Sequence, residues 1–282
     1  MAIDVDKLQP WVGRTENRED LISPVPVAGL SATLDYGATR ACAGEALPPL
    51  WHWLYFHSIP RPSETDRDGH AKRGEFLPPV PLPRRMWAGS RVSFESPLRV
   101  GDRARRISAI ASISHKTGKA GELVFVTVRH QVFREAVLAI EEEQDLVYRE
   151  TASGSTNPAP LPAPAQAQWT RDIEPDPVLL FRYSALTFNS HRIHYDRAYA
   201  TKVEGYPGLV VQGPLTATLL LDLLYREWPA AQVSRFQFRG TRPLFEDRPL
   251  RIQGRRESDH VVSLWTLDAS GALAMTAEAR LA

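Results

Sequence analysis

The chain is poor in the features that mark secreted, membrane-spanning or nucleic-acid-binding proteins. Its 282 residues include a single cysteine, Cys42, which excludes an intrachain disulfide and suits a reducing compartment. The 34 basic residues balance 33 acidic ones to a net charge of +1, so no overall field attracts nucleic acid or an anionic membrane. The N-terminus has no signal-peptide pattern, and Asp222 interrupts the longest apolar run. We therefore expect a cytoplasmic protein whose partners include neither nucleic acid nor a membrane.

A proline-rich stretch divides the chain into two parts. Residues 151–168, TASGSTNPAPLPAPAQAQ, alternate prolines with small residues, which is typical of an extended linker. We therefore expect an N-terminal domain over residues 1–150 and a C-terminal domain over residues 169–282, because each part is long enough to fold as a domain.

The two parts share a sequence pattern. SRVSFESPLRVGDRARRI begins at Ser90, and SRFQFRGTRPLFEDRPLRI begins at Ser234. Both contain Ser-Arg, alternating apolar positions that end in Phe, a Pro-Leu pair and an acidic turn with Asp-Arg. Strand-turn-strand segments can share such residues by coincidence. The equivalent positions of the two copies on either side of the linker nevertheless favour an internal duplication.

Each half is predicted to contain one long helix followed by antiparallel strands. In the second half, leucines at helical spacing follow the start signal Gly213-Pro214. In the first half, residues 46–60 occupy the corresponding position, and their aromatic cluster is predicted to be the buried face of a helix; the cluster comprises Trp51, Trp53, Tyr55 and Phe56. Alternating apolar segments follow in both halves. The expected fold class is α+β, a tandem (double) hot-dog in which each unit wraps an antiparallel sheet around a central helix.

The stretch LTFNSHRIHYDRAYA, residues 186–200, concentrates polar groups in the second half. VLLFRYSAL, residues 178–186, is predicted to be a strand leading into it, and a loop after it returns to Gly213 at a helix N-terminus. Free backbone N–H groups at a helix N-terminus suit an oxygen that gains negative charge. Together with a general base, such a donor meets the needs of adding water to an enoyl thioester.

FNSHRIHYD followed by YPGLVVQGPL resembles the hydration motif of MaoC-like enoyl-CoA hydratases, and is closer to the hydroxyacyl-thioester dehydratase type 2 family. The motif reads Asp-x-Asn-Pro-Ile/Val-His and is followed by a helix that begins His-Gly. The resemblance implies that His194 is the catalytic histidine, that Asn189 stands at the catalytic aspartate, and that Gly213 supplies the oxyanion amide. His191 replaces the asparagine of the motif, and Gln212 replaces the histidine before the glycine; both are predicted to bind substrate.

Asparagine at position 189 changes the chemistry that the resemblance implies. An amide does not accept a proton near neutral pH, so His194, with an ordinary pKa of about 6.5, is left as the titratable group. The carbonyl or N–H of Asn189 is then predicted to hold the nucleophilic water. A degenerate site that only binds acyl thioesters is the open alternative.

Several residues of this stretch also have purely structural interpretations. His194 alone is compatible with a buried structural histidine, Asp196 with a helix cap and Tyr195 with packing. His191 and His194 are spaced to hold a metal ion on one helical turn, but the segment offers no further convincing ligand. No metal and no cofactor are therefore predicted.

The resemblance implies reversible hydration of an enoyl-CoA or dehydration of a 3-hydroxyacyl-CoA, with coenzyme A as part of the substrate. The first half lacks the motif and is predicted to be a non-catalytic repeat that shapes the acyl pocket. The alternatives are a 3-hydroxyacyl-thioester dehydratase of fatty-acid metabolism, a hot-dog thioesterase and a non-catalytic acyl-thioester binding module. Homodimer formation is left open.

The full layout, including FLPPVPLPRRMWAGSRV, resembles the branch that acts on short branched dicarboxylyl-CoA esters such as 3-methylfumaryl-CoA (mesaconyl-CoA) or itaconyl-CoA. Such a substrate brings a free carboxylate into the acyl pocket. Burying that charge without a partner is costly, so a cationic side chain is expected to meet it. Arg84, Arg85 and Arg192 are the predicted candidates, with CoA phosphates or solvent as their alternative partners.

Overall fold

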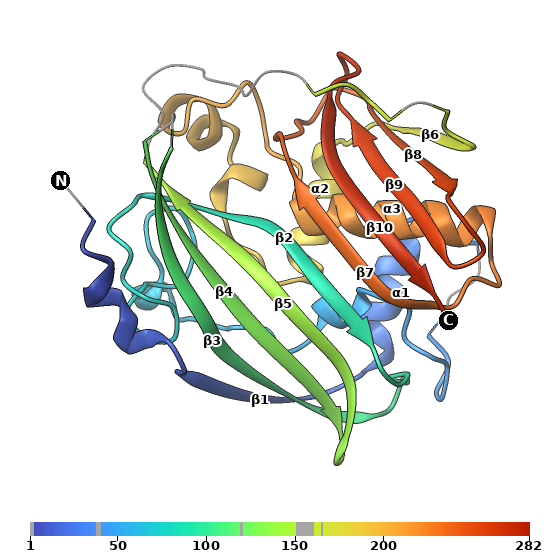
Figure 1. The fold of residues 1–282 in the computed structure, drawn as a ribbon, viewed down its shortest axis with the longest axis horizontal. Coiled ribbons are helices and arrows are strands. Elements are labelled where there is room, and N and C mark those ends of the chain that lie inside the picture. The colour runs from blue at the N-terminus through green and yellow to red at the C-terminus, as the bar shows by residue number, and fades with distance from the viewer. Residues whose placement is uncertain (1–2, 38–40, 119–120, 151–160, 165) are drawn as a thin grey trace.

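The computed structural model describes residues 3–37, 41–118, 121–150, 161–164 and 166–282. Their strands form one antiparallel sheet in the order β1-β3-β4-β5-β2-β7-β10-β9-β8-β6 (Figure 1). The strands of the first half are β1 (Thr15–Leu21), β2 (Arg84–Phe94), β3 (Arg103–Gly118), β4 (Gly121–Arg134) and β5 (Val137–Arg149). Those of the second half are β6 (Trp169–Ile173), β7 (Val233–Gly240), β8 (Leu250–Arg256), β9 (Val261–Leu267) and β10 (Leu273–Leu281).

The repeated sequence segments occupy equivalent strands. The first copy covers part of β2 and the start of β3, and the second covers β7 and the start of β8. β2 and β7 pair antiparallel at the centre of the sheet, with Val92 opposite Phe236 and Ser90 opposite Phe238. Outward from this pair the strands run β5-β4-β3-β1 on one side and β10-β9-β8-β6 on the other. The predicted equivalence of the two segments is confirmed, and the structure shows that the two halves pair edge to edge through them.

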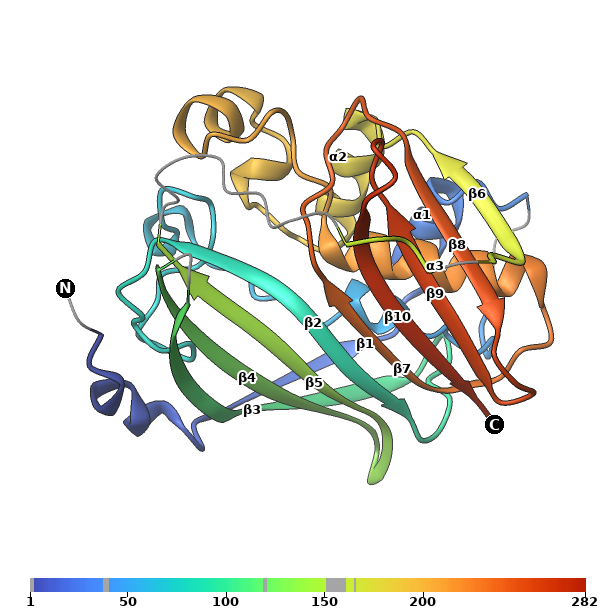
Figure 2. The same cartoon turned by 45° about the horizontal axis from the view of Figure 1, so that its top comes forward.

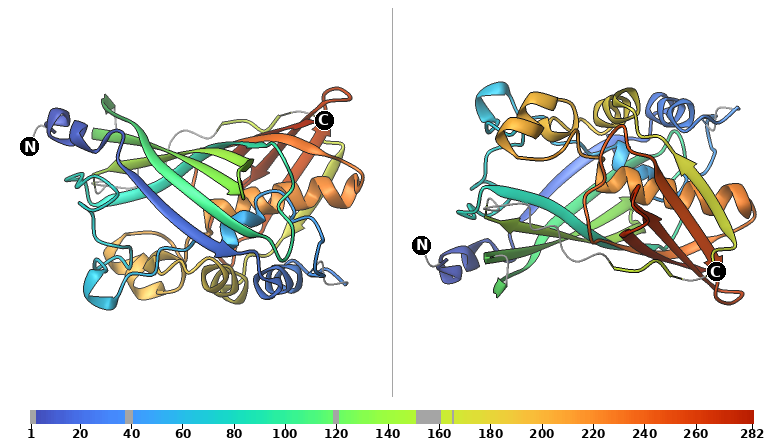
Figure 3. Two further views of the ribbon diagram at one scale, coloured as in Figure 1. Left: turned by 90° about the horizontal axis from the view of Figure 1, so that it is seen from below. Right: turned by 90° about the horizontal axis from the view of Figure 1, so that it is seen from above.

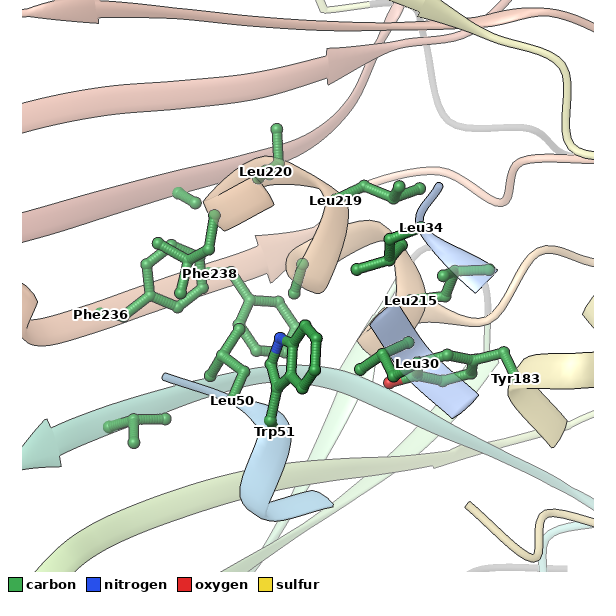
Figure 4. Packing of buried hydrophobic residues seen from close by; sticks show 14 of the residues in the cluster. Leu30, Leu34, Leu50, Trp51, Tyr183, Leu215, Leu219, Leu220, Phe236 and Phe238 are labelled. Carbon is green, nitrogen blue, oxygen red and sulfur yellow. The ribbon is translucent and has the colours of Figure 1, made fainter. Parts of the chain in front are cut away.

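Helix α3 (Gly213–Glu227) forms where the leucine spacing predicts it and lies against the sheet of the second half (Figure 2). Its leucines pack towards Phe236 and Phe238 of β7 in the shared core (Figure 4). Leu215 and Leu220 are fully buried, and each such side chain contributes about 1.5–3 kcal/mol relative to an exposed one. The second half therefore contains the central hot-dog helix that the sequence predicts.

The strand predicted for residues 178–186 is wrong, because these residues form helix α2 (Pro177–Leu186). The side chain of Asp176 accepts a hydrogen bond of 2.7 Å from the backbone N–H of Leu179, and Pro177 fills the first helical position. An Asp N-cap before a proline is a helix start signal. Leu180 and Tyr183, three residues apart on one face of the helix, are both buried in the core.

The long helix predicted for residues 46–60 is also wrong. Residues 51–54 form only a short 3-10 helix, η2 (Trp51–Leu54). Leu50 and Phe56 have φ angles of 71° and 59°, in the left-handed region, so the backbone cannot continue as an α-helix on either side. The aromatic cluster is still largely buried, with Trp51 and Tyr55 in the core. The first half therefore lacks, among its described residues, the counterpart of α3.

The remaining helices are short and frame one end of the sheet. Helix α1 (Pro24–Thr33) follows β1 as α2 follows β6, and the two helices pack side by side (Figure 3). The others are the 3-10 helices η1 (Val5–Trp11), η3 (Pro62–Glu64) and η4 (Arg192–His194) and the π-helix η5 (Tyr199–Val203). None of the helices described is long and apolar enough to cross a bilayer.

The predicted linker lies largely outside the described residues, since 151–160 and 165 are not among them. Its described remainder runs along the second half. The backbone N–H of Leu273 donates to the carbonyl of Leu161 at 3.1 Å, and that of Gln168 donates to the carbonyl of Gly254 at 2.9 Å. The domain boundaries at residues 150 and 169 stay a prediction.

Asp222 ties α3 to its surroundings from a buried position. One carboxylate oxygen accepts the hydroxyl of Tyr36, and the other pairs with Arg171 at 2.7 Å and Arg226 at 2.8 Å. Arg226 also donates to the carbonyl of Leu34, just beyond α1. One carboxylate thus links α3 to β6 and to the end of α1.

Replacing Asp222 with Ala is expected to lower the free energy of unfolding by about 3 kcal/mol, since it leaves two arginines and a hydroxyl without their common partner. Urea denaturation followed by circular dichroism measures the change. The matched control is Asp172→Ala, which removes a solvent-exposed partner of Arg251 and should cost much less. Equal losses in the two variants would contradict the assignment.

Candidate active site

The structure contains a cavity of about 970 Å³. Its walls come from both halves: strands β2, β4 and β5 with the loop that precedes β2, and residues 187–191, 193–194, 204–207, 210–214 and 240–245. It brings together His194, Asn189, Gly213, His191 and Gln212. The cavity is therefore the candidate active site.

His194 is oriented by the backbone. It is buried in η4, and its Nδ1 lies 2.7 Å from the carbonyl oxygen of Val210. Because a carbonyl only accepts, Nδ1 carries the hydrogen and Nε2 is left with a free lone pair. The segment that holds Val210 is braced in turn by Glu246, whose carboxylate accepts the N–H of Leu209 at 2.7 Å. His194 is thus held as a neutral imidazole whose remaining nitrogen is a base.

Gly213 begins α3 at the cavity wall. The first backbone bond into the helix is donated by Thr216 to the carbonyl of Gln212, at 3.1 Å, so the N–H of Gly213 precedes the intrahelical bonds. A Cβ built on Gly213 would meet only the carbonyl oxygen of Trp87, at 3.6 Å, which is ordinary contact. Gly213 also lines the cavity, and the helix dipole favours negative charge in front of its amide.

Gln212 fixes the start of α3 to α2. Its side-chain NH₂ donates to the carbonyl of Leu180 and to the hydroxyl of Ser184, both at 2.9 Å. Its Oε1 is buried without a hydrogen-bond partner among the described residues. The predicted substrate contact is thus restricted to this one oxygen, and the amide nitrogen has a structural role.

Asn189 uses its carbonyl oxygen within the motif, where Oδ1 accepts the backbone N–H of His191 at 3.0 Å. Its NH₂ group is the part left for a ligand in the cavity. Asp196 accepts the N–H of Tyr199 at 2.9 Å, as its structural interpretation as a helix cap predicts. Tyr195, predicted to pack, is instead largely exposed.

The first half supplies two polar residues that the sequence analysis did not single out, Asp68 and His70. Nδ1 of His70 lies 2.9 Å from a carboxylate oxygen of Asp68. The ring of His70 is 4.0 Å, centroid to centroid, from that of His191, which lies 5.3 Å from the ring of His194. The only signal in the sequence is a histidine within GHAKRGEF, residues 69–76, a basic segment that is also typical of a solvated loop.

Gly69 allows this approach of the two halves. A Cβ on Gly69 would lie 1.9 Å from the carbonyl oxygen of Ser190, and the φ of Gly69 is +91°, so no other residue fits without displacement. The backbone N–H of Arg192 donates to the carbonyl of Asp68 at 2.9 Å. The loop of the first half (cyan) lies beside the motif segment of the second (light orange) in Figure 3.

Burial keeps the three histidines neutral. It lowers the pKa of His194 to about 4, against the opposing effect of the Val210 carbonyl. It also lowers the pKa of His70 to about 4, with the charge of Arg85 acting in the same direction and Asp68 against it. The pKa of His191 is lowered further, by burial and by the two neighbouring histidines. Burial alone would raise the pKa of Asp68, but its bond to His70 and their charge interaction hold it below the usual range.

The three predicted arginines differ in their surroundings. Arg84 pairs with Glu204 at 2.8 Å, and Arg192 pairs with Asp196 at 2.7 Å. Arg192 is also absent from the cavity wall, so the prediction that it binds substrate is not supported by its position. Arg85 lines the cavity. No hydrogen bond or ion pair joins its side chain to any residue that the structure describes, and its charge acts on His70 and His191.

Asp68, His70 and His191 offer ligand atoms within 4.8 Å of one another, a set that is able to hold a metal ion. The sequence analysis found no third ligand near His191 and His194, because the candidates come from the other half of the chain. Asp68, however, already accepts the hydrogen of His70 Nδ1. A carboxylate that accepts the Nδ1 hydrogen fixes the orientation of an imidazole, whether that imidazole acts as a base or binds a metal ion.

The fold and the site define a double hot-dog protein with a hydratase-type cavity. Solved structures agree on the fold. A MaoC-like dehydratase from Phytophthora capsici superposes with a TM-score of 0.69 over 99% of both chains at 15% identity. A Mycobacterium tuberculosis protein with a double hotdog fold does so with a TM-score of 0.60 over 96% of both chains at 16% identity.

Sequence comparison then gives the family. The model of the hydroxyacyl-thioester dehydratase type 2 family matches residues 50–246. The mesaconyl-C(4)-CoA hydratase of Chloroflexus aurantiacus is 47% identical over 96% of both chains. The mitochondrial hydroxyacyl-thioester dehydratase type 2 of Schizosaccharomyces pombe is 30% identical over 83% of this chain and 88% of its own. The chain belongs to the hydroxyacyl-thioester dehydratase type 2 family, and as a member it is a hydro-lyase.

The buried neutral histidines predict how stability depends on pH. Unfolded histidines have a pKa of about 6.5, so between pH 6.5 and 4 the unfolded chain takes up protons that the folded protein does not. The free energy of unfolding should therefore fall over that range, by on the order of 3 kcal/mol for His194 alone.

Urea unfolding at pH 7.0, 5.5 and 4.5 tests this expectation. A His194→Gln variant, which has no imidazole at this position, should show a shallower slope than the wild-type protein. A free energy of unfolding that stays constant between pH 7.0 and 4.5 would contradict it.

Proposed function

We propose that the protein catalyses the reversible hydration of a C4-dicarboxylyl-CoA of the mesaconyl-C4-CoA type. The observation that carries the proposal is the guanidinium of Arg85, which has no ion-pair partner among the described residues and lies beside the histidines of the cavity. In such an ester the free carboxylate is bonded directly to the β-carbon, so it must lie within a bond or two of the site of water addition. A buried carboxylate requires a cationic partner, and Arg85 is placed to be that partner.

Two features support Arg85 over the other predicted arginines. Arg84 is neutralised by Glu204, and Arg192 by Asp196 outside the cavity. On β2, Arg85 lies opposite Tyr148, which is fully buried, so strand alternation directs its side chain to the inner face of the sheet. The curated relative named mesaconyl-C(4)-CoA hydratase, at 47% identity, supports the same substrate class.

In the proposed reaction Nε2 of His194 takes a proton from water as the water oxygen bonds to the β-carbon. The electron pair of the double bond moves towards the α-carbon and the thioester oxygen, where the N–H of Gly213 stabilises the negative charge. The imidazolium then returns the proton to the α-carbon, so His194 ends neutral. The steps require no redox cofactor, because no electrons are exchanged. A neutral imidazole at the start agrees with the lowered pKa of His194.

A thioesterase is disfavoured because a carboxylate would be needed at the position that Asn189 occupies. A fatty-acyl dehydratase is the second candidate, since the family name itself denotes hydroxyacyl-thioester dehydration. A long acyl chain, however, would leave the Arg85 guanidinium without a counter-charge. Comparing substrates therefore separates the two.

Replacing His194 with Ala should lower kcat by roughly 10²- to 10⁴-fold, the contribution of a positioned general base. Asn189→Ala should have a smaller effect, because it removes a contact in the cavity without removing the base. Activity is followed by the loss of enoyl-thioester absorbance. Near-normal turnover by the His194 variant would disprove the mechanism.

Replacing Arg85 with Met should lower kcat/KM for mesaconyl-C4-CoA about 100-fold, or about 3 kcal/mol, the scale of a charge-assisted bidentate pair. The same substitution should leave crotonyl-CoA turnover unchanged or raise it, since crotonyl-CoA has no carboxylate. The control is Arg129→Met, an arginine of β4 exposed outside the cavity wall. If the wild-type enzyme turns over crotonyl-CoA as well as mesaconyl-C4-CoA, the dicarboxylate assignment fails and the hydratase chemistry stands.

A further inference from the structure

The motif lacks a second acceptor for the catalytic water, and the first half of the chain offers one. A water that attacks carbon is best oriented when both of its hydrogens are held, so that a lone pair points at the β-carbon. His194 holds one hydrogen. Asn189, in place of the carboxylate, has its oxygen engaged with the N–H of His191 and presents only donors.

We propose that His70, oriented by Asp68, is a catalytic residue that accepts the second hydrogen of the nucleophilic water. The inference rests on the proposed function. It makes the active site a joint product of both halves and corrects the expectation that the first half only shapes the acyl pocket.

The arrangement of His70 mirrors that of His194. Each ring has Nδ1 bound to a fixed acceptor, the Asp68 carboxylate at 2.9 Å or the Val210 carbonyl at 2.7 Å. Each therefore has a free lone pair on Nε2 and lines the same cavity. Both rings lie next to that of His191, at centroid distances of 4.0 Å and 5.3 Å. Two neutral acceptors that line one cavity are able to hold the two hydrogens of a single water.

The position of His70 is built into the backbone. Within the loop, Gly69 donates to the carbonyl of Asp66 at 2.9 Å, and Asp66 donates to that of His70 at 2.7 Å. Asp68 is tied to the motif through the N–H of Arg192, and the hydroxyl of Ser190 donates to the carbonyl of Gly69. The close contact at Gly69 admits only glycine. These contacts hold the loop against the motif segment and thereby fix the position of the His70 side chain.

Protons balance with His70 in this role. The water gives one proton to His194 and keeps the other, hydrogen-bonded to Nε2 of His70, as the hydroxyl hydrogen of the product. His194 returns its proton to the α-carbon. His70 is never protonated, which is consistent with its neutral state beside Arg85.

The test separates water addition from α-carbon proton transfer. The saturated analogue of the substrate has an α-hydrogen but no double bond, so its exchange in D₂O requires His194 and Gly213 and no nucleophilic water. His70→Ala is expected to lose about 10²-fold in hydration while its exchange rate stays within about 3-fold of wild type, because only the water contact is removed. His194→Ala should lose both activities.

Two further variants sharpen the result. Asp68→Asn, which removes the charge that fixes the His70 ring, should lose less hydration than His70→Ala and also keep exchange. His115→Ala, whose imidazole is paired with Glu122 outside the cavity wall, should keep both activities.

Three outcomes would overturn the proposal. In the first, His70→Ala hydrates mesaconyl-C4-CoA at the wild-type rate. In the second, the variant loses exchange in parallel with hydration, as a collapsed site would. In the third, dialysis against EDTA abolishes wild-type activity and Zn²⁺ restores it, which would assign Asp68, His70 and His191 to a metal. A wild-type enzyme that hydrates only other enoyl-CoAs would refute the substrate assignment and leave this test valid with the accepted ester.

Discussion

The pairing of β2 with β7 is the contact on which the rest of the structure depends. It joins two five-stranded halves into one sheet. The residue-by-residue register of the two strands fixes the position of one half relative to the other. Because that register is fixed, the loop at Asp68 and the motif at Ser190 meet closely enough for Gly69 to require the absence of a side chain. A shift by one residue along β2 would turn its inner side chains outward and move this loop away from the motif.

Electrostatics within the cavity follow from the same closure. The three histidines are neutral because the surrounding protein excludes the water that would solvate their charged forms. Arg85 adds a positive charge beside two of them. A substrate anion that pairs with Arg85 would remove part of the repulsion on His70 and His191, so binding and basicity are coupled through one guanidinium.

The sequence predicted the features that depend on local pattern. The leucine spacing of α3, the repeated segments at Ser90 and Ser234, and the family resemblance of the motif around His194 are confirmed. It failed for α2, because the short apolar run of residues 178–186 was interpreted as a strand although the helix start signal Asp176-Pro177 precedes it. It failed at residues 46–60 because left-handed residues such as Leu50 interrupt an otherwise helix-like pattern. His70 was missed because the motif residue that it contacts, His191, lies more than a hundred residues away in the sequence, a distance that no local motif spans.

The two halves differ in that the described residues of the first contain no counterpart of α3. This difference affects how substitutions can alter the function of such a protein. In an assembly of two identical hot-dog subunits, every substitution appears twice, so neither subunit can discard its helix without the other doing so. A tandem chain encodes the two units separately. Here one unit contains α3 with Gly213 at its start, while the described residues of the other contain no such helix and contribute the loop that carries His70 to the cavity. Specificity can therefore be altered through the first half alone, while the residues of the hydration motif stay as they are.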